Sequence, residues 1–174
     1  MKIVKVPDKI LTAPTKPVEK FDDLLRQTVQ EMEETLKRQD DPEGVGLSAN
    51  QVGLDLRLAI VRLNPEDQDA VPHLLAIVNP QIISRSSALA KEYEGCLSVP
   101  NKYGPIERSE AVTVQFQDLK GETLTIKAAG FLARIFQHEI DHLDGHLVTE
   151  RSAGPFLTEE ELEEKFSKQR TANS

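Results

Sequence analysis

Two histidines and a glutamate lie close together in residues 137–144, with a spacing that suits metal chemistry. His138 and His142 are four residues apart, so on an α-helix both imidazoles lie on one face and can reach a single ion. Glu139 follows the first histidine and could accept a proton from metal-bound water without being a ligand itself. Because two ligands do not complete a catalytic metal site, the motif requires a third ligand elsewhere.

Three positions are candidates for the third ligand. In metzincin-type metalloproteases the motif continues to a third histidine, but the corresponding residue here is Val148. His146 follows Gly145, at which the helix is expected to end, and is interpreted as an exposed residue. Cys96 stands beside Gly95 at an expected strand edge. A lone cysteine is usually a small core residue, but cysteine with two histidines is also a known catalytic metal geometry.

The residues that precede the motif predict a helix buried on two sides. Residues 131–143 carry two stripes at helical spacing, one of Phe131, Ile135, His138 and His142 and the other of Leu132, Phe136, Ile140 and Leu143. A helix with two such stripes is expected in the centre of the fold.

The first half of the chain predicts one surface helix followed by strands. Apolar residues recur at helical spacing from Phe21, and this amphipathic helix is expected to end near residues 39–42. Residues 57–63 and 74–79 are interpreted as short buried strands, and residues 80–93 as a continuation of the sheet. His73, in the loop between those strands, is interpreted as exposed and without a role.

The second half predicts a hairpin and a C-terminal helix around the central one. Residues 112–126 alternate between apolar and polar about a turn at 118–121, which is typical of an antiparallel hairpin. Residues 158–161 resemble a capping box that opens a short helix, and residues 168–174 are expected to form a frayed tail. The predicted fold is α+β, with antiparallel sheets surrounding the central helix.

Composition narrows the class of protein. A length of 174 residues is most simply one domain, 1–174. The net charge of -8 argues against a nucleic-acid or anionic-membrane partner. A single cysteine cannot form an intrachain disulfide, and the sequence shows no signal-peptide core or transmembrane run. We therefore expect a cytoplasmic protein.

A glycine-containing segment before the first strand leaves two interpretations open. Gly44, Gly46 and Ala49 match a dinucleotide-binding fingerprint, but a helix precedes them where a strand is required. A tight turn is sufficient to explain the glycines. The Asn50–Gln51 pair lies between apolar neighbours, and a buried amide needs partners. Gln51 is therefore either a structural hydrogen-bonding residue or a donor in a site.

Three segments resemble the signature motifs of the peptide deformylase family, in that family's order. They are Gly-Val-Gly-Leu-Ser-Ala-Asn-Gln at 44–51, Glu-Gly-Cys-Leu-Ser at 94–98 and Gln-His-Glu-Ile-Asp-His at 137–142. Residues 7–11 and Arg108 also fall where the family has similar residues. The resemblance extends over nearly the whole chain. It implies removal of the N-formyl group from the initiator methionine of new polypeptides, with release of formate.

The resemblance also implies roles for individual residues. By matching position, the metal ligands would be Cys96, His138 and His142. Glu139 would be the general acid/base, while the Gln51 amide and the Leu97 backbone N–H would face the developing oxyanion. The pocket for the methionine side chain would be lined by Val45, Gly46, Phe131, Arg134 and Ile135. Only the aliphatic stem of Arg134 would then contact the substrate.

Cofactor and partners follow from the same resemblance. One divalent ion per chain is expected. Fe²⁺ is the ion that members of the family usually bind, and Zn²⁺, Ni²⁺ or Co²⁺ are alternatives. The partners would be N-formylmethionyl nascent peptides, with no direct nucleic-acid or membrane contact, and the chain would be a monomer. Some family members dock transiently on the ribosome through a basic C-terminal helix. That mode is not expected here, because the helix carries Glu159, Glu160, Glu161, Glu163 and Glu164.

Two other interpretations use the same motif. A zinc endopeptidase would cleave internal bonds of unformylated peptides, and an inactive metal-binding protein would need only the ligands. Glu139 and Gln51 favour an enzyme, because neither residue is needed merely to hold a metal.

Overall fold

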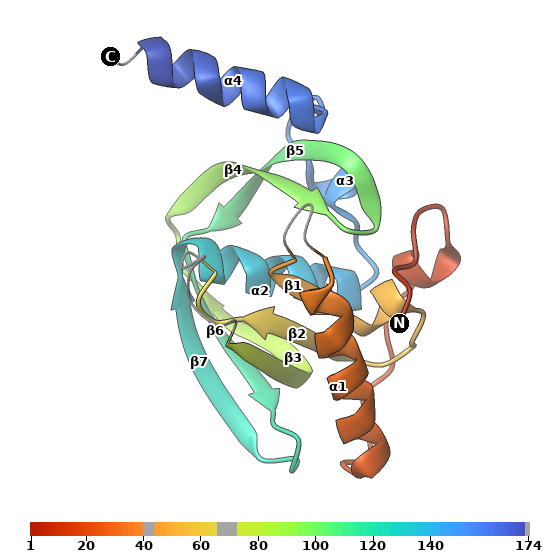
Figure 1. Ribbon diagram of the computed structural model, residues 1–174. Helices are drawn as coiled ribbons and strands as arrows, with labels where there is room; N and C mark the ends of the chain where they lie inside the picture. Colours follow the sequence, from red (N-terminus) through yellow and green to blue (C-terminus); the bar gives the residue numbers. More distant parts are fainter. Residues whose placement is uncertain (40–43, 66–72, 173–174) are drawn as a thin grey trace.

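Helix α2 (Gly130–Leu143) lies in the centre of the molecule, between two antiparallel sheets (Figure 1). The structure is a computed structural model that describes residues 1–39, 44–65 and 73–172. One sheet has five strands and the other has two. The predicted α+β fold, with antiparallel sheets surrounding the central helix, is therefore confirmed.

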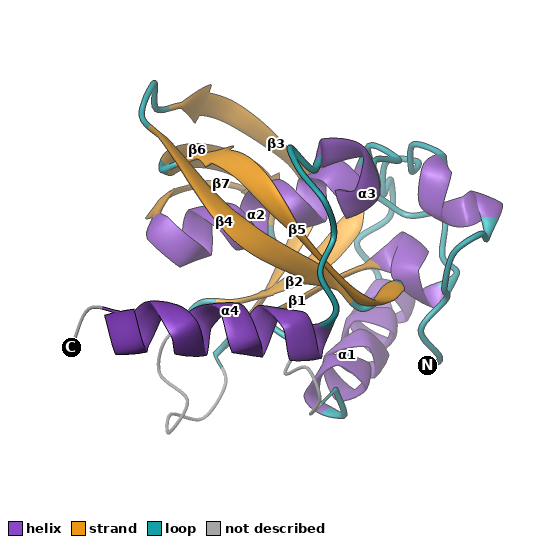
Figure 2. Cartoon of the chain, turned by 90° about the horizontal axis from the view of Figure 1, so that it is seen from above, coloured by secondary structure: helices purple, strands orange, loops and turns teal. Residues whose placement is uncertain are grey.

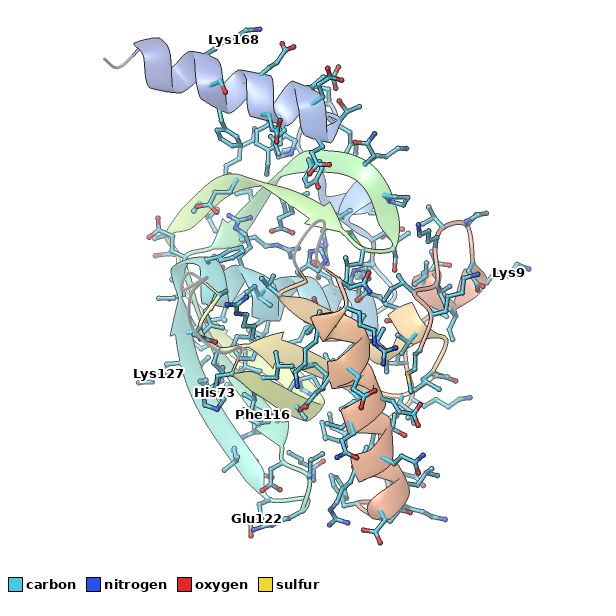
Figure 3. All side chains as sticks on the ribbon, in the orientation of Figure 1. Lys9, His73, Phe116, Glu122, Lys127 and Lys168 are labelled. Atoms are coloured by element: carbon cyan, nitrogen blue, oxygen red, sulfur yellow. The ribbon has the colours of Figure 1, made fainter. Side chains whose placement is uncertain are left out.

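The larger sheet supplies the main apolar surface for α2. Its strand order is β1-β2-β3-β6-β7, with β1 (Gly46–Ser48), β2 (Leu58–Arg62), β3 (Leu74–Arg85), β6 (Ala111–Gln117) and β7 (Thr123–Ala129). Ala59, Ile77 and Val114, from three of these strands, share one buried cluster with the apolar face of α2. The predicted strands and the hairpin β6–β7 are confirmed. His73, directly before β3, is exposed as predicted (Figure 3).

The smaller sheet was only partly predicted. We expected residues 80–93 to continue one sheet, but β3 ends at Arg85 and β4 (Leu89–Cys96) pairs with β5 (Val99–Ser109) on the other side of α2. Strand β5 was not predicted, because its Pro100, Gly104 and Pro105 interrupt the pattern of a regular strand.

Helix α1 (Asp23–Lys37) packs one face against the larger sheet. The side chain of Asp22 caps its first turn by accepting a hydrogen bond from the Leu25 N–H at 3.1 Å. Most of its apolar stripe is buried as predicted, namely Leu25, Val29, Met32 and Leu36. The prediction was wrong for Leu24, which is 70% exposed because it lies on the side of the helix away from the sheet. The helix ends at Lys37, slightly before the predicted end near residues 39–42, of which 40–42 lie outside the described residues.

Helix α2 ends where the sequence predicts. Gly145 has a φ of 81°, and its N–H donates to the His142 carbonyl at 3.0 Å. The His146 N–H donates to the Asp141 carbonyl at 2.8 Å. These two bonds form a Schellman motif, which satisfies carbonyls that the last turn would otherwise leave unpaired.

The C-terminal helix is longer than expected. Two short 3₁₀ turns, η1 (Lys9–Thr12) and η2 (Ala49–Val52), and helix α3 (Val148–Arg151) complete the smaller elements. Helix α4 (Glu159–Ala172) runs across β4 and β5 (Figure 2). It opens with the predicted capping box between Thr158 and Glu161, and it includes residues 168–172, which we had placed in a frayed tail. None of the helices in the described residues is both long and apolar enough to cross a membrane.

The C-terminal stop of α2 generates a stability prediction. We expect Gly145→Ala to lower the free energy of unfolding by about 3 kcal/mol, since a positive φ disfavours alanine by about 1–2 kcal/mol and overpacking adds to that cost. An added Cβ would lie 2.8 Å from the Ala13 carbonyl carbon. Urea denaturation of the metal-free protein measures the change.

Gly130→Ala is the matched control for this prediction. Gly130 also has a positive φ, of 58°, but an added Cβ there meets nothing within 4 Å. We expect it to lower the free energy of unfolding by only about 1 kcal/mol. Equal losses in the two variants would contradict the close contact assigned to Gly145.

Candidate metal centre and active site

Three potential metal ligands converge from two elements. Cys96 ends β4, while His138 and His142 lie one turn apart on α2. His142 Nε2 lies 3.2 Å from Cys96 Sγ and 3.2 Å from His138 Nε2, and the three ligand atoms all lie within 4.8 Å of one another. Ligands bound tetrahedrally at about 2.0–2.3 Å are separated by roughly 3.3–3.8 Å. The cluster therefore fits one metal ion without rearrangement of the backbone.

The orientation of His138 is set by a buried carboxylate. Its Nδ1 lies 3.0 Å from Glu94 Oε2, and Glu94 is 6% exposed. A hydrogen bond from Nδ1–H to this carboxylate leaves Nε2 with its lone pair directed at the cluster. The arrangement is the one by which proteins commonly orient a metal-binding histidine.

The same carboxylate is held by two arginines. Arg108 donates to both oxygens of Glu94 at 2.9 Å, and Arg134 donates to Oε1 at 2.6 Å. Arg108 also bonds Asp141 of α2. Burial by itself would raise the pKa of the Glu94 carboxyl, but hydrogen bonds from Arg108 and His138 hold it far below its usual range. Glu94 is therefore an anion that accepts hydrogen bonds from all three partners.

Cys96 is placed in surroundings that favour its thiolate form. Burial would raise the pKa of this thiol, but the neighbouring His142 and His138 rings outweigh that effect and lower the pKa well below its ordinary value. The thiolate is the form that binds metals. From the sequence, Cys96 could be either a small core residue or a metal ligand. It is buried, but its sulfur lies against the histidine cluster, and this position favours the ligand.

Glu139 lies beside the cluster without a partner of its own. It is 3% exposed, and its Oε2 has no hydrogen-bond partner among the described residues. Burial raises the pKa of its carboxyl, and His138 and His142 offset this only in part. The backbone of Gly46 lies against this carboxylate, since a Cβ added there would collide with it. The reason for this glycine is close approach in the extended strand β1, and our interpretation as a tight turn was wrong for Gly46.

Gln51 is fixed at one end and directed into the site at the other. Its Oε1 accepts from the Ser48 backbone N–H and from the Ser48 hydroxyl, both at 3.0 Å. Its Nε2 lies 3.6 Å from Cys96 Sγ and 3.2 Å from Ser98 Oγ. Both interpretations of Gln51 therefore describe part of its environment: the oxygen anchors it, and the amide nitrogen lies next to a potential metal ligand.

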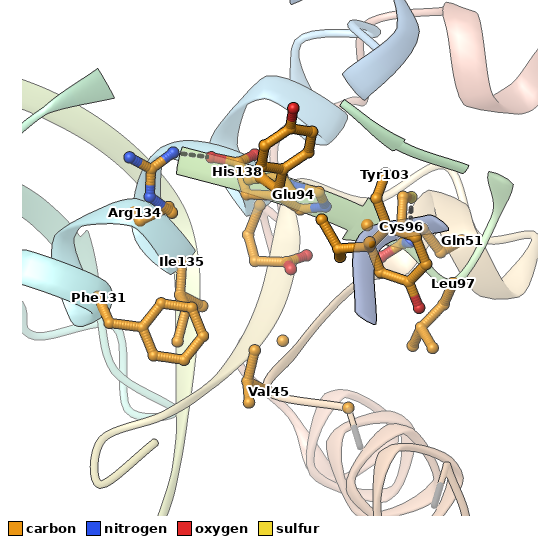
Figure 4. A pocket seen from close by; sticks show the side chains of 16 residues that line it. Val45, Gln51, Glu94, Cys96, Leu97, Tyr103, Phe131, Arg134, Ile135 and His138 are labelled. Carbon is orange, nitrogen blue, oxygen red and sulfur yellow. Dashed lines mark hydrogen bonds and ion pairs between the residues drawn. The ribbon is translucent and has the colours of Figure 1, made fainter. Parts of the chain in front are cut away.

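A pocket of about 260 Å³ opens beside the cluster (Figure 4). It brings together Cys96, His138 and Glu139 with Gln51 and Leu97. The five residues expected around the methionine side chain also line it, namely Val45, Gly46, Phe131, Arg134 and Ile135. His146 is exposed and pairs with Glu150, so it lies outside the cluster as predicted.

Arg134 lines the pocket, and its guanidinium is held by groups of the neighbouring strands. Its guanidinium donates to Glu94 and to the backbone carbonyls of Ile106 and Ala90. Three other lining residues, Tyr93, Tyr103 and Leu162, were not predicted. They come from β4, β5 and α4, and no local pattern in the sequence marks them as members of one site.

A metal-binding cluster beside a buried glutamate, at the base of a largely apolar pocket, is the arrangement of a metal-dependent hydrolase. Comparison with known proteins specifies the family. The sequence model of polypeptide deformylase matches residues 1–155. The peptide deformylase of Dictyoglomus turgidum is 43% identical over 152 residues, which cover 87% of this chain and 92% of that protein. That of Borreliella burgdorferi is 44% identical over 147 residues, which cover 84% of each.

Solved structures of peptide deformylases have the same fold as this chain. The crystal structure of peptide deformylase from Thermotoga maritima superposes with a TM-score of 0.79 at 35% identity, covering 88% of this chain and 97% of that chain. A Synechococcus elongatus peptide deformylase in complex with actinonin gives a TM-score of 0.80 at 38% identity, covering 97% and 86% respectively. The chain belongs to the polypeptide deformylase family, a family of metal-dependent hydrolases that remove the N-formyl group from nascent peptides.

The Glu94–His138 contact generates a prediction about metal affinity. We expect Glu94→Gln to weaken metal binding by about 10- to 100-fold, because a neutral amide orients and polarises the imidazole less strongly than a carboxylate. Titration of the metal-free protein with Co²⁺, followed by the thiolate absorption band, measures the affinity.

Glu92→Gln is the control for this prediction. Glu92 is on the same strand and pairs with Arg134 at 3.1 Å, but its side chain is 59% exposed. It makes no contact with His138 in the described structure, and its removal should leave the Co²⁺ affinity within about twofold. Equal affinities in the Glu94 and Glu92 variants would show that Glu94 does not orient the ligand.

Proposed function

We propose that Cys96, His138 and His142 hold one divalent metal ion with which this chain hydrolyses the formyl group of N-formylmethionyl peptides, releasing formate. The observation that carries this assignment is the convergence of the three ligand atoms next to the unpartnered oxygen of Glu139, at the base of the pocket. We propose Fe²⁺ as the ion, with Zn²⁺, Ni²⁺ or Co²⁺ as alternatives. A mixed sulfur and nitrogen ligand set suits all four.

A divalent ion bound at this cluster would lower the pKa of a bound water towards about 7 and would polarise the formyl carbonyl. Glu139 would take the proton of that water at Oε2 and later deliver it to the departing amine of the methionine. Its burial supports this role, because a raised pKa makes the Glu139 carboxylate a stronger base towards the proton of the water. Within the described part of the chain no hydrogen bond competes for this oxygen, which leaves it available to the water.

Two N–H groups are proposed to stabilise the oxyanion of the tetrahedral intermediate. The Gln51 Nε2 lies beside Cys96 and is held there by the anchored Oε1. Leu97 follows Cys96 in the chain and borders the same pocket, and its backbone N–H is the second proposed donor. Donors that are fixed before the substrate arrives stabilise developing charge without a reorganisation cost.

The methionine side chain is proposed to occupy the part of the pocket lined by Val45, Phe131 and Ile135. Phe131 and Ile135 project from α2 towards Val45 (Figure 4), and the stem of Arg134 completes the wall. Contacts of this kind are non-directional and suit a flexible thioether. We propose nascent peptides as the partners of a cytoplasmic monomer, without ribosome docking through α4, because its N-terminal half exposes five glutamates.

Substitution of Glu139 tests the proposed function. Wild-type protein, purified without oxygen and loaded with metal, should release formate from a formyl-Met peptide and leave unformylated peptides intact. Glu139→Gln should keep its metal but lower kcat by about 10²- to 10⁴-fold, because the amide cannot accept the proton. Formate release and metal content are measured on the same samples.

Glu150→Gln is the control, because Glu150 is exposed and pairs only with His146 and the Leu147 N–H among the contacts described. It should behave as wild type. The proposed role of Glu139 is wrong if Glu139→Gln retains turnover within a few-fold at saturating metal.

The contact between Gly46 and Glu139 gives a second prediction about turnover. Gly46→Ala should lower kcat by about 10- to 100-fold, since the added methyl must displace the Glu139 carboxylate, and small displacements of a catalytic group are costly. Metal content should not change, as no ligand lies against Gly46 in the described contacts. A full kcat with alanine at this position would mean that the carboxylate tolerates displacement.

A further inference from the structure

Helix α4 reaches the pocket although the sequence match to the family ends before it, at residue 155. Leu162 of α4 is one of the pocket-lining residues. It is half-buried, whereas the other described side chains of α4, residues 159–168, are exposed. Leu162 is therefore the side chain by which this largely charged helix contributes to the pocket.

Several contacts hold α4 in this position. The Glu159 N–H at its start donates to Asn101 Oδ1 at 3.0 Å. Further along, Lys165 Nζ donates to the Tyr93 hydroxyl at 2.6 Å and lies 4.6 Å from the centre of its ring. The Phe166 ring meets Tyr93 edge to face, with ring centroids 6.3 Å apart. Both ends of the segment that carries Leu162 are therefore tied to the smaller sheet.

The chain before α4 is also fixed. Leu157 and Tyr103 exchange two backbone hydrogen bonds of 2.9 Å, which attach this segment to β5. The Tyr103 ring lies directly over Gly95, since an added Cβ would approach its Cε1 to 2.5 Å. Gly95 precedes Cys96, so the ring covers the backbone next to the metal cluster. Tyr103 and Leu162 both line the pocket, and Figure 4 shows Tyr103 at the end of the pocket where Leu97 lies. We call these two residues the second wall.

This wall lies apart from the part of the pocket proposed for methionine. Figure 4 shows Phe131 and Ile135 at one end and Leu97 and Tyr103 at the other, with the cluster residue His138 between them. We place the formyl group at the cluster and the methionine side chain at Phe131 and Ile135. The remainder of the bound peptide then extends out of the pocket past the second wall. The residue that follows formylmethionine therefore lies nearest to that wall.

We infer that Leu162, with Tyr93 and Tyr103, forms a binding site for the side chain of the residue that follows formylmethionine. The site selects for an apolar side chain of leucine size, because the Leu162 side chain and the rings of Tyr93 and Tyr103 offer apolar surface to the pocket. This inference depends on the proposed function for the position of the formyl group. It assigns α4 a part in substrate selection.

The test compares two peptides that differ only in the second residue, formyl-Met-Leu amide and formyl-Met-Gly amide. Wild type should show a higher kcat/KM for the leucine peptide. Leu162→Ser should lower kcat/KM for the leucine peptide by about 5- to 20-fold through KM, since loss of an apolar contact costs this much. In the same variant, kcat/KM for the glycine peptide should change less than twofold, because glycine has no side chain to place against Leu162.

Two further variants make the result decisive. Leu162→Met keeps an apolar side chain of similar size and should restore the preference. Leu24→Ser removes a leucine of α1 that is 70% exposed and lies outside the pocket lining. It should leave kcat/KM for both peptides unchanged. The inference would be overturned if wild type hydrolysed both peptides with the same kcat/KM, or if Leu162→Ser lowered kcat/KM equally for both peptides. If wild type releases no formate from either peptide, the proposed function fails instead.

Discussion

The buried carboxylate of Glu94 is the constraint on which the site depends. An anion removed from water needs several hydrogen bonds, and here Arg108, Arg134 and His138 supply them. These partners come from β5 and α2, so the requirement to neutralise one side chain of β4 fixes the smaller sheet against the central helix. Removing one partner of such a buried network typically costs about 3–5 kcal/mol. Cys96, two residues after Glu94, is placed beside the histidines by the same contacts.

The two sides of α2 perform different tasks. Phe136, Ile140 and Leu143 bury one side in the core of the larger sheet. Arg134 and His138 are on the side that faces the smaller sheet, where they meet Glu94. From the sequence, both histidines fall in one of the two predicted stripes, but the residues that each stripe contacts could not be predicted. In the structure, one stripe contributes apolar burial, and the other holds charges and ligands whose positions depend on partners far along the chain.

The parts of the fold that could be predicted from sequence are those that depend on local pattern. Periodicity located α1, α2 and the β6–β7 hairpin, and Gly145 located the end of α2, because each signal lies within the element itself. Strand β5 was missed, since its prolines and glycine do not resemble a strand and its order depends on pairing with β4. The Glu94 network was missed as a network because Arg108 and Arg134 are 14 and 40 residues from Glu94.

Candidate site residues divide in the same way. The motifs predicted the candidate ligands, Glu139 and Gln51 from their residue types. Tyr103 and Leu162 belong to residue types that no motif singles out, and only the folded structure shows that they line the pocket. Two motif glycines explain how the assembly is possible. A side chain at Gly46 would displace the Glu139 carboxylate, and one at Gly95 would strike the Tyr103 ring. The missing side chains thus allow β1 to lie against the Glu139 carboxylate and β4 to lie against the Tyr103 ring. The glycines of such a motif leave room for neighbouring side chains, just as its polar residues supply functional groups. Which side chain needs that room can be known only from the folded structure, because the neighbours come from other elements.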